Sequence, residues 1–232
     1  MRPSLPDMTY DLYIGDRTFS SWSLRGWLML EKFGLPYRAH LIGLYSGTMA
    51  EDMAPLAPAR LVPALKLPDG VVVGESLAMA ETLAERHPDK GLWPVDAAAR
   101  ATARWLCAEM VASFTALRGA CPMQLQHVNE GFEPSDAVQA DLDRIETLWR
   151  HAATFKTEGP WLFGAYSLAD AFYAPVCARI VGYDLAVSDA ARDYCMTTVA
   201  DAAFQNWRSE GQKVTYDPFP YDVGLPTRDW PV

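Results

Sequence analysis

The sequence lacks the features that would place it in a membrane or in an oxidising compartment. It has no run of about eighteen apolar residues, the length that spans a bilayer as a helix. The first eight residues, MRPSLPDM, contain no apolar signal-peptide region. No C-x-x-C pair occurs among the four cysteines, which are Cys107, Cys121, Cys177 and Cys195. We therefore expect a cytoplasmic protein with reduced thiols, no disulfide framework and no metal site.

Basic residues are also scarce, since 20 Lys and Arg stand against 29 Asp and Glu, a formal net charge of -9. Nucleic-acid binding depends on neutralising phosphates with Lys and Arg, so we expect no nucleic-acid partner. Any anionic ligand must be held by local cations. The chain has 232 residues, of which 50% are hydrophobic and 21% charged. This composition predicts a globular protein with one large or two small domains.

Strand and helix signals alternate in the first part of the chain. Residues 10–15 and 36–42 have strand character, and an amphipathic helix from Ser20 ends near Gly34 and Pro36. A short helix is expected over 48–53. An Asp69-Gly70 turn joins predicted strands at 64–67 and 71–73, and a helix follows over 75–86.

The rest of the chain has helical patterns only. Residues 87–100 contain two prolines and a glycine and are typical of a domain linker. Helices are predicted over 97–117, 136–155, 168–181, 189–199 and 203–212. The tail from residue 216 to residue 232 is too rich in proline for a helix. We therefore expect an all-α second domain.

The segment FSSWSLRGWLML places Ser20, Ser21 and Ser23 at a strand-to-helix turn. Serine is a preferred N-cap, but one serine would suffice for capping. Ligands bind at such turns in open α/β sheets, so both capping and ligand contact stay open on these residues alone.

Several ordered pieces resemble the cytosolic glutathione transferase family over nearly the whole chain. These are the serine turn, LVPAL around Val62 and Pro63, ESLAMAETL from Glu75, and SLADAF from Ser167. The serine turn is most similar to the zeta-type motif, with Trp22 where that motif has a cysteine. The resemblance implies an α/β thioredoxin-like domain over residues 8–87 and an all-α domain over 98–232 that lines the second-substrate pocket.

The resemblance also implies how glutathione, the co-substrate, would bind. Pro63 would be a cis-proline that leaves the Val62 backbone free to pair with the cysteinyl part. Ser76 at a helix start would hold the γ-glutamyl carboxylate, and Glu75 its ammonium group. A cation for the glycyl carboxylate is expected among Arg60, His40 and Lys66, with Arg60 preferred.

A serine hydroxyl would stabilise the glutathione thiolate by donating a hydrogen bond to it. The resemblance makes Ser20 the first choice and Ser21 the second, with Ser23 as the helix cap. No basic partner is needed, because the serine is not a nucleophile, which separates this site from that of a serine hydrolase.

For other residues, a role in packing or helix capping has to be weighed against contact with a substrate. The second-substrate pocket implied by the resemblance is formed by Trp22, Met110, Phe114 and Arg118. Core packing is the commoner fate of an apolar helical stripe. Arg118 at the cleft mouth would favour an anionic electrophile. Ser167 and Asp170 have the spacing of a capping box and are interpreted as folding residues.

The predicted function is that of a glutathione transferase that activates the thiol of glutathione to attack a small electrophile. A homodimer is usual for the resembled family. Two alternatives stay open. One is a non-catalytic, transferase-like module that binds a partner protein. The other is a glutathione-dependent cis-trans isomerase of a maleyl-type diacid.

Overall fold

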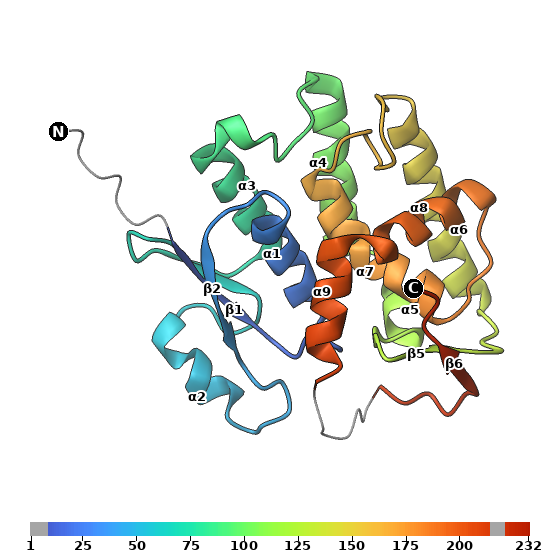
Figure 1. The fold of residues 1–232 in the computed structure, drawn as a ribbon, viewed down its shortest axis with the longest axis horizontal. Coiled ribbons are helices and arrows are strands. Elements are labelled where there is room, and N and C mark those ends of the chain that lie inside the picture. The colour runs from blue at the N-terminus through green and yellow to red at the C-terminus, as the bar shows by residue number, and fades with distance from the viewer. Residues whose placement is uncertain (1–8, 214–220) are drawn as a thin grey trace.

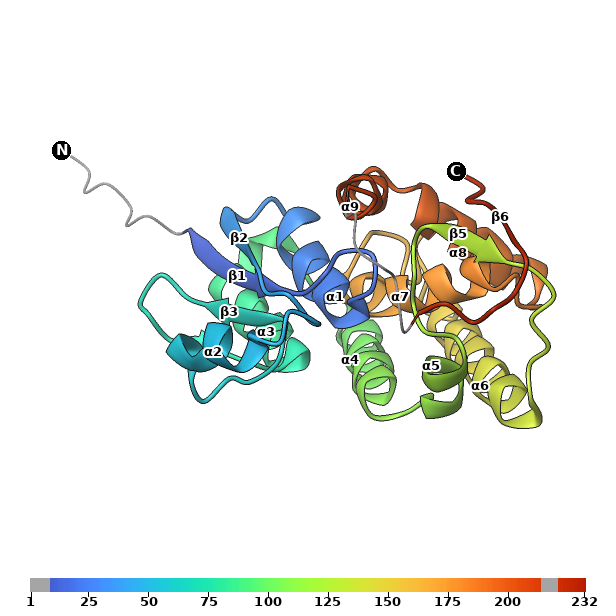
Figure 2. The ribbon, with the colours of Figure 1, turned by 90° about the horizontal axis from the view of Figure 1, so that it is seen from below.

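The computed structural model describes residues 9–213 and 221–232. Met8, where the predicted first domain begins, and residues 216–220 of the predicted tail lie outside the described residues. Figures 1 and 2 show a sheet-containing part beside a larger helical part, with helices α1 and α7 between them. Within the described ranges, no helix is long and apolar enough to cross a membrane.

The first part contains a four-stranded sheet in the order β2-β1-β3-β4. Strands β1 and β2 are parallel, whereas β3 is antiparallel to both β1 and β4. Its elements are β1 (Tyr10–Ile14), α1 (Ser21–Glu31), β2 (Tyr37–Leu41), α2 (Met49–Met53), a 3-10 turn (Ala54–Leu56), β3 (Ala64–Lys66), β4 (Val72–Val73) and α3 (Ser76–Arg86). This confirms the thioredoxin-like order predicted from the sequence.

The second part is built mainly from helices. These are α4 (Ala97–Ala112), α5 (Thr115–Ala120), α6 (Asp136–Ala153), α7 (Leu168–Gly182), α8 (Asp189–Ala200) and α9 (Ala202–Gly211). A short 3-10 turn (Pro88–Lys90) lies in the predicted linker. Asp96 ends the linker and caps α4 by accepting a hydrogen bond from the Ala99 N–H at 2.8 Å. The helical second domain is thus confirmed, while the ranges 8–87 and 98–232 remain our proposed division of the chain.

The structure corrects two details of this domain. The single helix predicted over 97–117 is interrupted at Phe114, whose φ of 61° lies in the left-handed region. The break starts α5 in a new direction, and Asp141 of α6 accepts a hydrogen bond from the Leu117 N–H at 2.9 Å. Second, β5 (His127–Asn129) pairs with β6 (Thr227–Asp229) in a two-stranded antiparallel sheet. Strands of three residues are too short to give a readable alternation.

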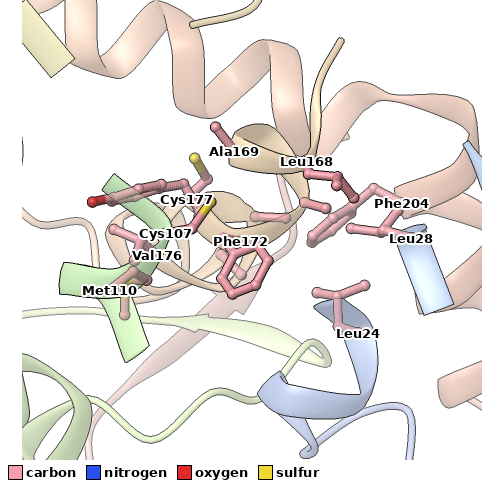
Figure 3. Close-up of a cluster of buried hydrophobic side chains, with 14 of the residues drawn as sticks. Leu24, Leu28, Cys107, Met110, Leu168, Ala169, Phe172, Val176, Cys177 and Phe204 are labelled. Carbon is pink, nitrogen blue, oxygen red and sulfur yellow. The ribbon is translucent and has the colours of Figure 1, made fainter. Parts of the chain in front are cut away.

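The core is centred on α7, in which every residue is buried. A helix that is apolar on all sides is expected at the centre of a domain. Figure 3 shows Leu24 and Leu28 of α1 directed toward Phe172 and Leu168 of α7. Packing of α1 on α7 therefore joins the sheet to the helical domain.

The start of α7 is fixed by the predicted capping box. The Asp170 carboxylate accepts hydrogen bonds from the Ser167 N–H at 2.8 Å and the Leu162 N–H at 3.0 Å. It also accepts from the hydroxyls of Ser167 and Tyr194, each at 3.1 Å. Burial outweighs these bonds and raises the pKa of Asp170 to about 6. Asp170 thus satisfies donors from three separate segments.

Asp170→Ala is expected to lower the free energy of unfolding by about 3 to 5 kcal/mol, because several buried donors lose their acceptor together. Asp136→Ala is the matched control: it removes an exposed acid from the first turn of α6. That control should cost about 1 kcal/mol or less. Urea denaturation of both variants checks the difference, and equal losses would contradict the role given to Asp170.

Candidate functional site

A cleft of about 750 Å³ lies where the sheet-containing part meets the helical part. Four segments of the first part contribute to it: residues 19–22 at the start of α1, residues 44, 45 and 49 after β2, residues 61–63 before β3, and residues 74–76 at the start of α3. The opposite wall comes from α5, α7 and the segment after α5. Two helix N-termini therefore open into one cleft, where they favour negatively charged groups.

The serine turn is held by hydrogen bonds among its own members. Ser20 is the N-cap of α1, and its Oγ accepts from the Ser23 N–H at 3.3 Å. The Ser20 hydroxyl donates to Ser23 Oγ at 2.8 Å, and Ser23 Oγ accepts from the Gly15 N–H at 2.8 Å. The expectation that Ser23 caps the helix is therefore wrong. A cap needs extended backbone, which Ser20 has and Ser23, inside the helix, does not.

Ser21 has a different environment from its two neighbours. It is the first residue of α1 and lines the cleft. Its hydroxyl makes no hydrogen bond within the described chain, whereas those of Ser20 and Ser23 are both engaged. Of the three serines, Ser21 is thus the one whose hydroxyl can turn to a ligand without breaking a hydrogen bond.

The Val62–Pro63 peptide is cis, as the resemblance implied. Both residues line the cleft, and the described chain offers no hydrogen-bond partner to the Val62 N–H or C=O. Buried backbone groups are normally paired, so an unpaired donor and acceptor at a cleft wall suit an extended peptide ligand. Pro63 lies against Gly26 of α1, where an added Cβ atom would come within 2.8 Å of the proline Cβ.

Glu75 and Ser76 stand side by side at the start of α3 and both line the cleft. Glu75 occupies the N-cap position without a side-chain capping bond, and its side chain is exposed. Ser76 is buried, and its Oγ has no hydrogen-bond partner in the structure. A buried hydroxyl beside unpaired helix N–H groups is suited to a carboxylate, and the neighbouring acid to a cation.

Several predicted residues lie elsewhere. Arg60 is exposed and does not line the cleft. Neither does Lys66 or His40, and His40 pairs with Asp11 at 2.8 Å. Trp22 and Arg118 do line it.

The prediction that Met110 and Phe114 line the second-substrate pocket is wrong, because both are buried in the hydrophobic core and do not reach the cleft. Their helical spacing identified a buried face but could not identify what that face packs against.

The sequence reasoning missed several cleft residues, two of which come from the part of the chain after α6. Arg179 of α7 is one, and the signal was available, because it is the one cation in the mostly apolar run 168–182. Tyr221 is the other; its ring stacks on Phe19 at 4.4 Å, and its hydroxyl lies 2.5 Å from that of Tyr45. Among the described residues, no group of three or more His, Cys, Asp or Glu could hold a metal.

Comparisons with known proteins agree with this architecture. The model of the family described as "Glutathione S-transferase, N-terminal domain" matches residues 19–86. The chain is 29% identical over 173 residues to maleylacetoacetate isomerase of Rattus norvegicus, covering 72% of this chain and 76% of the relative. It is 35% identical over 94 residues to maleylacetoacetate isomerase of Dictyostelium discoideum, covering 40% of this chain and 42% of the relative. The chain thus aligns with less than half of that relative.

Solved structures show the same fold. A glutathione transferase homologue from Burkholderia with bound glutathione has a TM-score of 0.64 and 23% identity, covering 89% of this chain and 100% of that one. A second homologue with bound glutathione, from Sulfitobacter, has a TM-score of 0.62 and 21% identity, covering 88% and 99%. These comparisons show that residues 19–86 match the N-terminal domain family of glutathione S-transferases and that the chain as a whole has the glutathione transferase fold.

Proposed function

We propose that the protein binds glutathione in the cleft between its two parts and uses the bound thiol in catalysis. The observation that carries this proposal is that three kinds of partner line one cleft: the free Ser21 hydroxyl, the unpaired Val62 backbone and the Glu75-Ser76 pair. They match, in order, the thiol, the peptide group and the γ-glutamyl end of an extended glutathione molecule. The relatives with bound glutathione support the same ligand.

The γ-glutamyl end brings one carboxylate and one ammonium group. The carboxylate is assigned to Ser76 and the N-terminus of α3, where N–H groups and the helix dipole favour an anion. The ammonium group is assigned to Glu75, whose carboxylate is free of a capping bond. Burial of the Ser76 hydroxyl without a partner would be costly in a site that had no ligand to bind.

The thiol is assigned to Ser21. Lowering a thiol pKa from about 8.5 to about 6.5 needs about 2.7 kcal/mol of preference for the thiolate. A partly buried helix N-terminus supplies up to about 2 kcal/mol, and one hydrogen bond to a charged acceptor supplies about 1.5 to 3 kcal/mol. The start of α1 and one hydroxyl are therefore enough, and no basic side chain is required.

The reaction we favour is cis-trans isomerisation of a maleyl-type diacid, because relatives aligned with up to 72% of the chain are named maleylacetoacetate isomerases. The thiolate would add to one carbon of the double bond, and the electron pair would move into the adjacent carbonyl. Rotation about the new single bond and expulsion of the thiolate would restore the double bond as trans. Conjugation of glutathione to an electrophile uses the same first step and is the second candidate.

Glu75→Gln is expected to weaken glutathione binding by about tenfold, because a charge-assisted hydrogen bond to the ammonium group is lost. Calorimetric titration of the folded variant measures the change. Glu85→Gln removes an exposed acid near the other end of the same helix and should bind glutathione as the parent does. Equal glutathione affinity of the parent, Glu75→Gln and Glu85→Gln would show that Glu75 does not contact glutathione.

Ser21→Ala is expected to raise the pKa of the bound thiol by about one to two units, because the thiolate loses a hydrogen-bond donor. Thiolate absorbance followed against pH reports this directly, and activity lost near pH 6.5 should largely return near pH 9. Ser20→Ala is the matched control. It should lower stability by about 1 kcal/mol through loss of the cap while leaving the thiol pKa near its parent value. A raised thiol pKa in Ser20→Ala and an unchanged thiol pKa in Ser21→Ala would instead assign the hydrogen bond to the thiolate to Ser20.

Incubation with maleylacetoacetate and glutathione separates the two candidate reactions. Isomerisation should give the trans product while the glutathione concentration stays constant, whereas conjugation consumes one glutathione per product. A protein that binds glutathione but transforms neither this substrate nor a panel of electrophiles would be a binding module.

A further inference from the structure

Two tyrosine hydroxyls from distant parts of the chain meet at the cleft. Tyr45 lies in the loop after β2, Tyr221 lies in the tail after α9, and both line the cleft. Their Oη atoms are 2.5 Å apart and share one hydrogen bond, and their rings meet edge to face with centres 5.9 Å apart. None of the contacts assigned to glutathione uses either hydroxyl.

The loop that carries Tyr45 is fixed against the turn between β1 and α1. The Asp16 carboxylate accepts a hydrogen bond from the Leu44 N–H at 3.2 Å. Gly15 lies so close to Leu44 that a Cβ atom at the glycine would come within 2.7 Å of the leucine Cδ2. The backbone next to Tyr45 is therefore held beside the serine turn, while the Tyr45 side chain itself is 57% exposed and can reach a ligand.

Tyr221 is held by ring stacking and by the tail that carries it. Its ring stacks on the buried Phe19 ring, with centres 4.4 Å apart and planes 18° apart. Phe19 stands two residues before Ser21 in the sequence. Further along the tail, β6 pairs with β5 and Trp230 is buried. Tyr221 thus brings its hydroxyl to the side of the cleft where the serine turn lies.

The hydroxyl pair keeps one proton that the described residues do not use. A hydrogen bond between two phenols uses one O–H as the donor and leaves the other O–H free. Among residues 9–213 and 221–232, neither hydroxyl has a further hydrogen-bond partner. Burial and the hydrogen bond to Tyr45 raise the pKa of Tyr221, as expected for the hydroxyl that donates. The free proton is then that of Tyr45, the more exposed of the two residues.

Addition of a thiolate to a double bond conjugated with a carbonyl group creates negative charge away from the sulfur. The C–S bond forms, the π electron pair of the C=C bond moves toward the carbonyl carbon, and the carbonyl oxygen becomes an enolate oxygen. A preorganised donor at that oxygen stabilises the enolate more than the neutral carbonyl. When the adduct collapses, the electron pair returns and the C–S bond breaks, so the donor keeps its proton and no further reactant is consumed.

We propose that the Tyr45 hydroxyl donates a hydrogen bond to the carbonyl oxygen of the acceptor as the glutathione thiolate adds, with Tyr221 as the positioning residue that orients it. The inference rests on the proposed function, because it supplies a partner for the charge that develops in that reaction. A hydroxyl that accepts one hydrogen bond donates another more strongly, since aligned hydrogen bonds polarise one another. The site therefore favours acceptors whose double bond is conjugated with a carbonyl group.

Two glutathione thioethers test this hydrogen bond without turnover. S-(3-oxobutyl)glutathione carries a carbonyl oxygen at the position of the enolate oxygen, and S-butylglutathione has a methylene group in place of that carbonyl. In calorimetric titrations, Tyr45→Phe should weaken binding of the ketone by about three- to tenfold and leave binding of S-butylglutathione unchanged. Tyr221→Phe should weaken ketone binding by a smaller factor. Tyr37→Phe is the matched control, because the hydroxyl that it removes donates to Glu31 outside the cleft.

Turnover with glutathione gives a second readout. The conjugated ketone 4-phenyl-3-buten-2-one is compared with 1-chloro-2,4-dinitrobenzene, an acceptor that has no carbonyl group. Tyr45→Phe should lower kcat for the ketone by about a hundredfold and kcat for the dinitro compound by less than about twofold. The pKa of the bound thiol should stay at its parent value, because the thiol is assigned to Ser21.

Parent-like binding and turnover of the ketones by Tyr45→Phe would overturn the proposal. Equal losses for both thioethers would also overturn it, because they would indicate a packing role for Tyr45. A loss of ketone binding in Arg118→Gln but not in Tyr45→Phe would assign the oxygen to the guanidinium group instead. Failure of the parent to bind either thioether would contradict the proposed function as well, whereas binding of both thioethers without dependence on Tyr45 would contradict this inference alone.

Discussion

The close approach of α1 to Pro63 is the constraint on which the cleft depends. A Cβ atom at Gly26 would lie 2.8 Å from the Pro63 Cβ and 2.9 Å from its Cγ, so only glycine allows this spacing. The contact fixes how far the start of α1 stands from the Val62 backbone. On its other side, α1 packs Leu24 and Leu28 into the core beside α7. One helix thus places the serine turn, the Val62–Pro63 segment and the helical wall relative to one another.

The three serines at that helix start differ in how they are hydrogen-bonded within the fold. Ser20 and Ser23 exchange hydrogen bonds with each other and with Gly15, and so tie the end of β1 to the first turn of α1. Ser21, between them in sequence, is spared from this network. A preorganised donor is more effective when its neighbours, rather than the donor itself, stabilise the turn.

The sequence predicted those elements of the fold whose residue pattern was long enough to recognise. The helix from Ser21 had clear apolar periodicity, the strand from Tyr10 had β-branched and aromatic content, and both were predicted correctly. The break at Phe114 had no proline or glycine to announce it, since it is imposed by packing of α5 on α6. The cleft residues that came from short local motifs lie together. The sequence could not show that Met110 packs in the core and not at the cleft, because periodicity identifies a buried helix face but not the residues that pack against it.

The overall acidic composition did not predict positively charged residues at the cleft. A strongly acidic chain gives no hint of a cation at the cleft, yet Arg179 is the one cation of a mostly apolar helix and has no ion pair within the described residues. The fold brings it to the same cleft as Arg118 from a distant part of the sequence. The cleft thereby has one side formed by the sheet-containing part, where the serine turn and the Val62 backbone lie, and one side formed by helices, where Arg118 and Arg179 lie.

A crystal structure of the protein with glutathione tests the central claim most directly. The account predicts the sulfur within hydrogen-bond distance of Ser21 Oγ, the cysteinyl backbone paired with Val62, and the γ-glutamyl carboxylate on Ser76. Glutathione bound outside this cleft, or in the cleft with its sulfur remote from the start of α1, would contradict it.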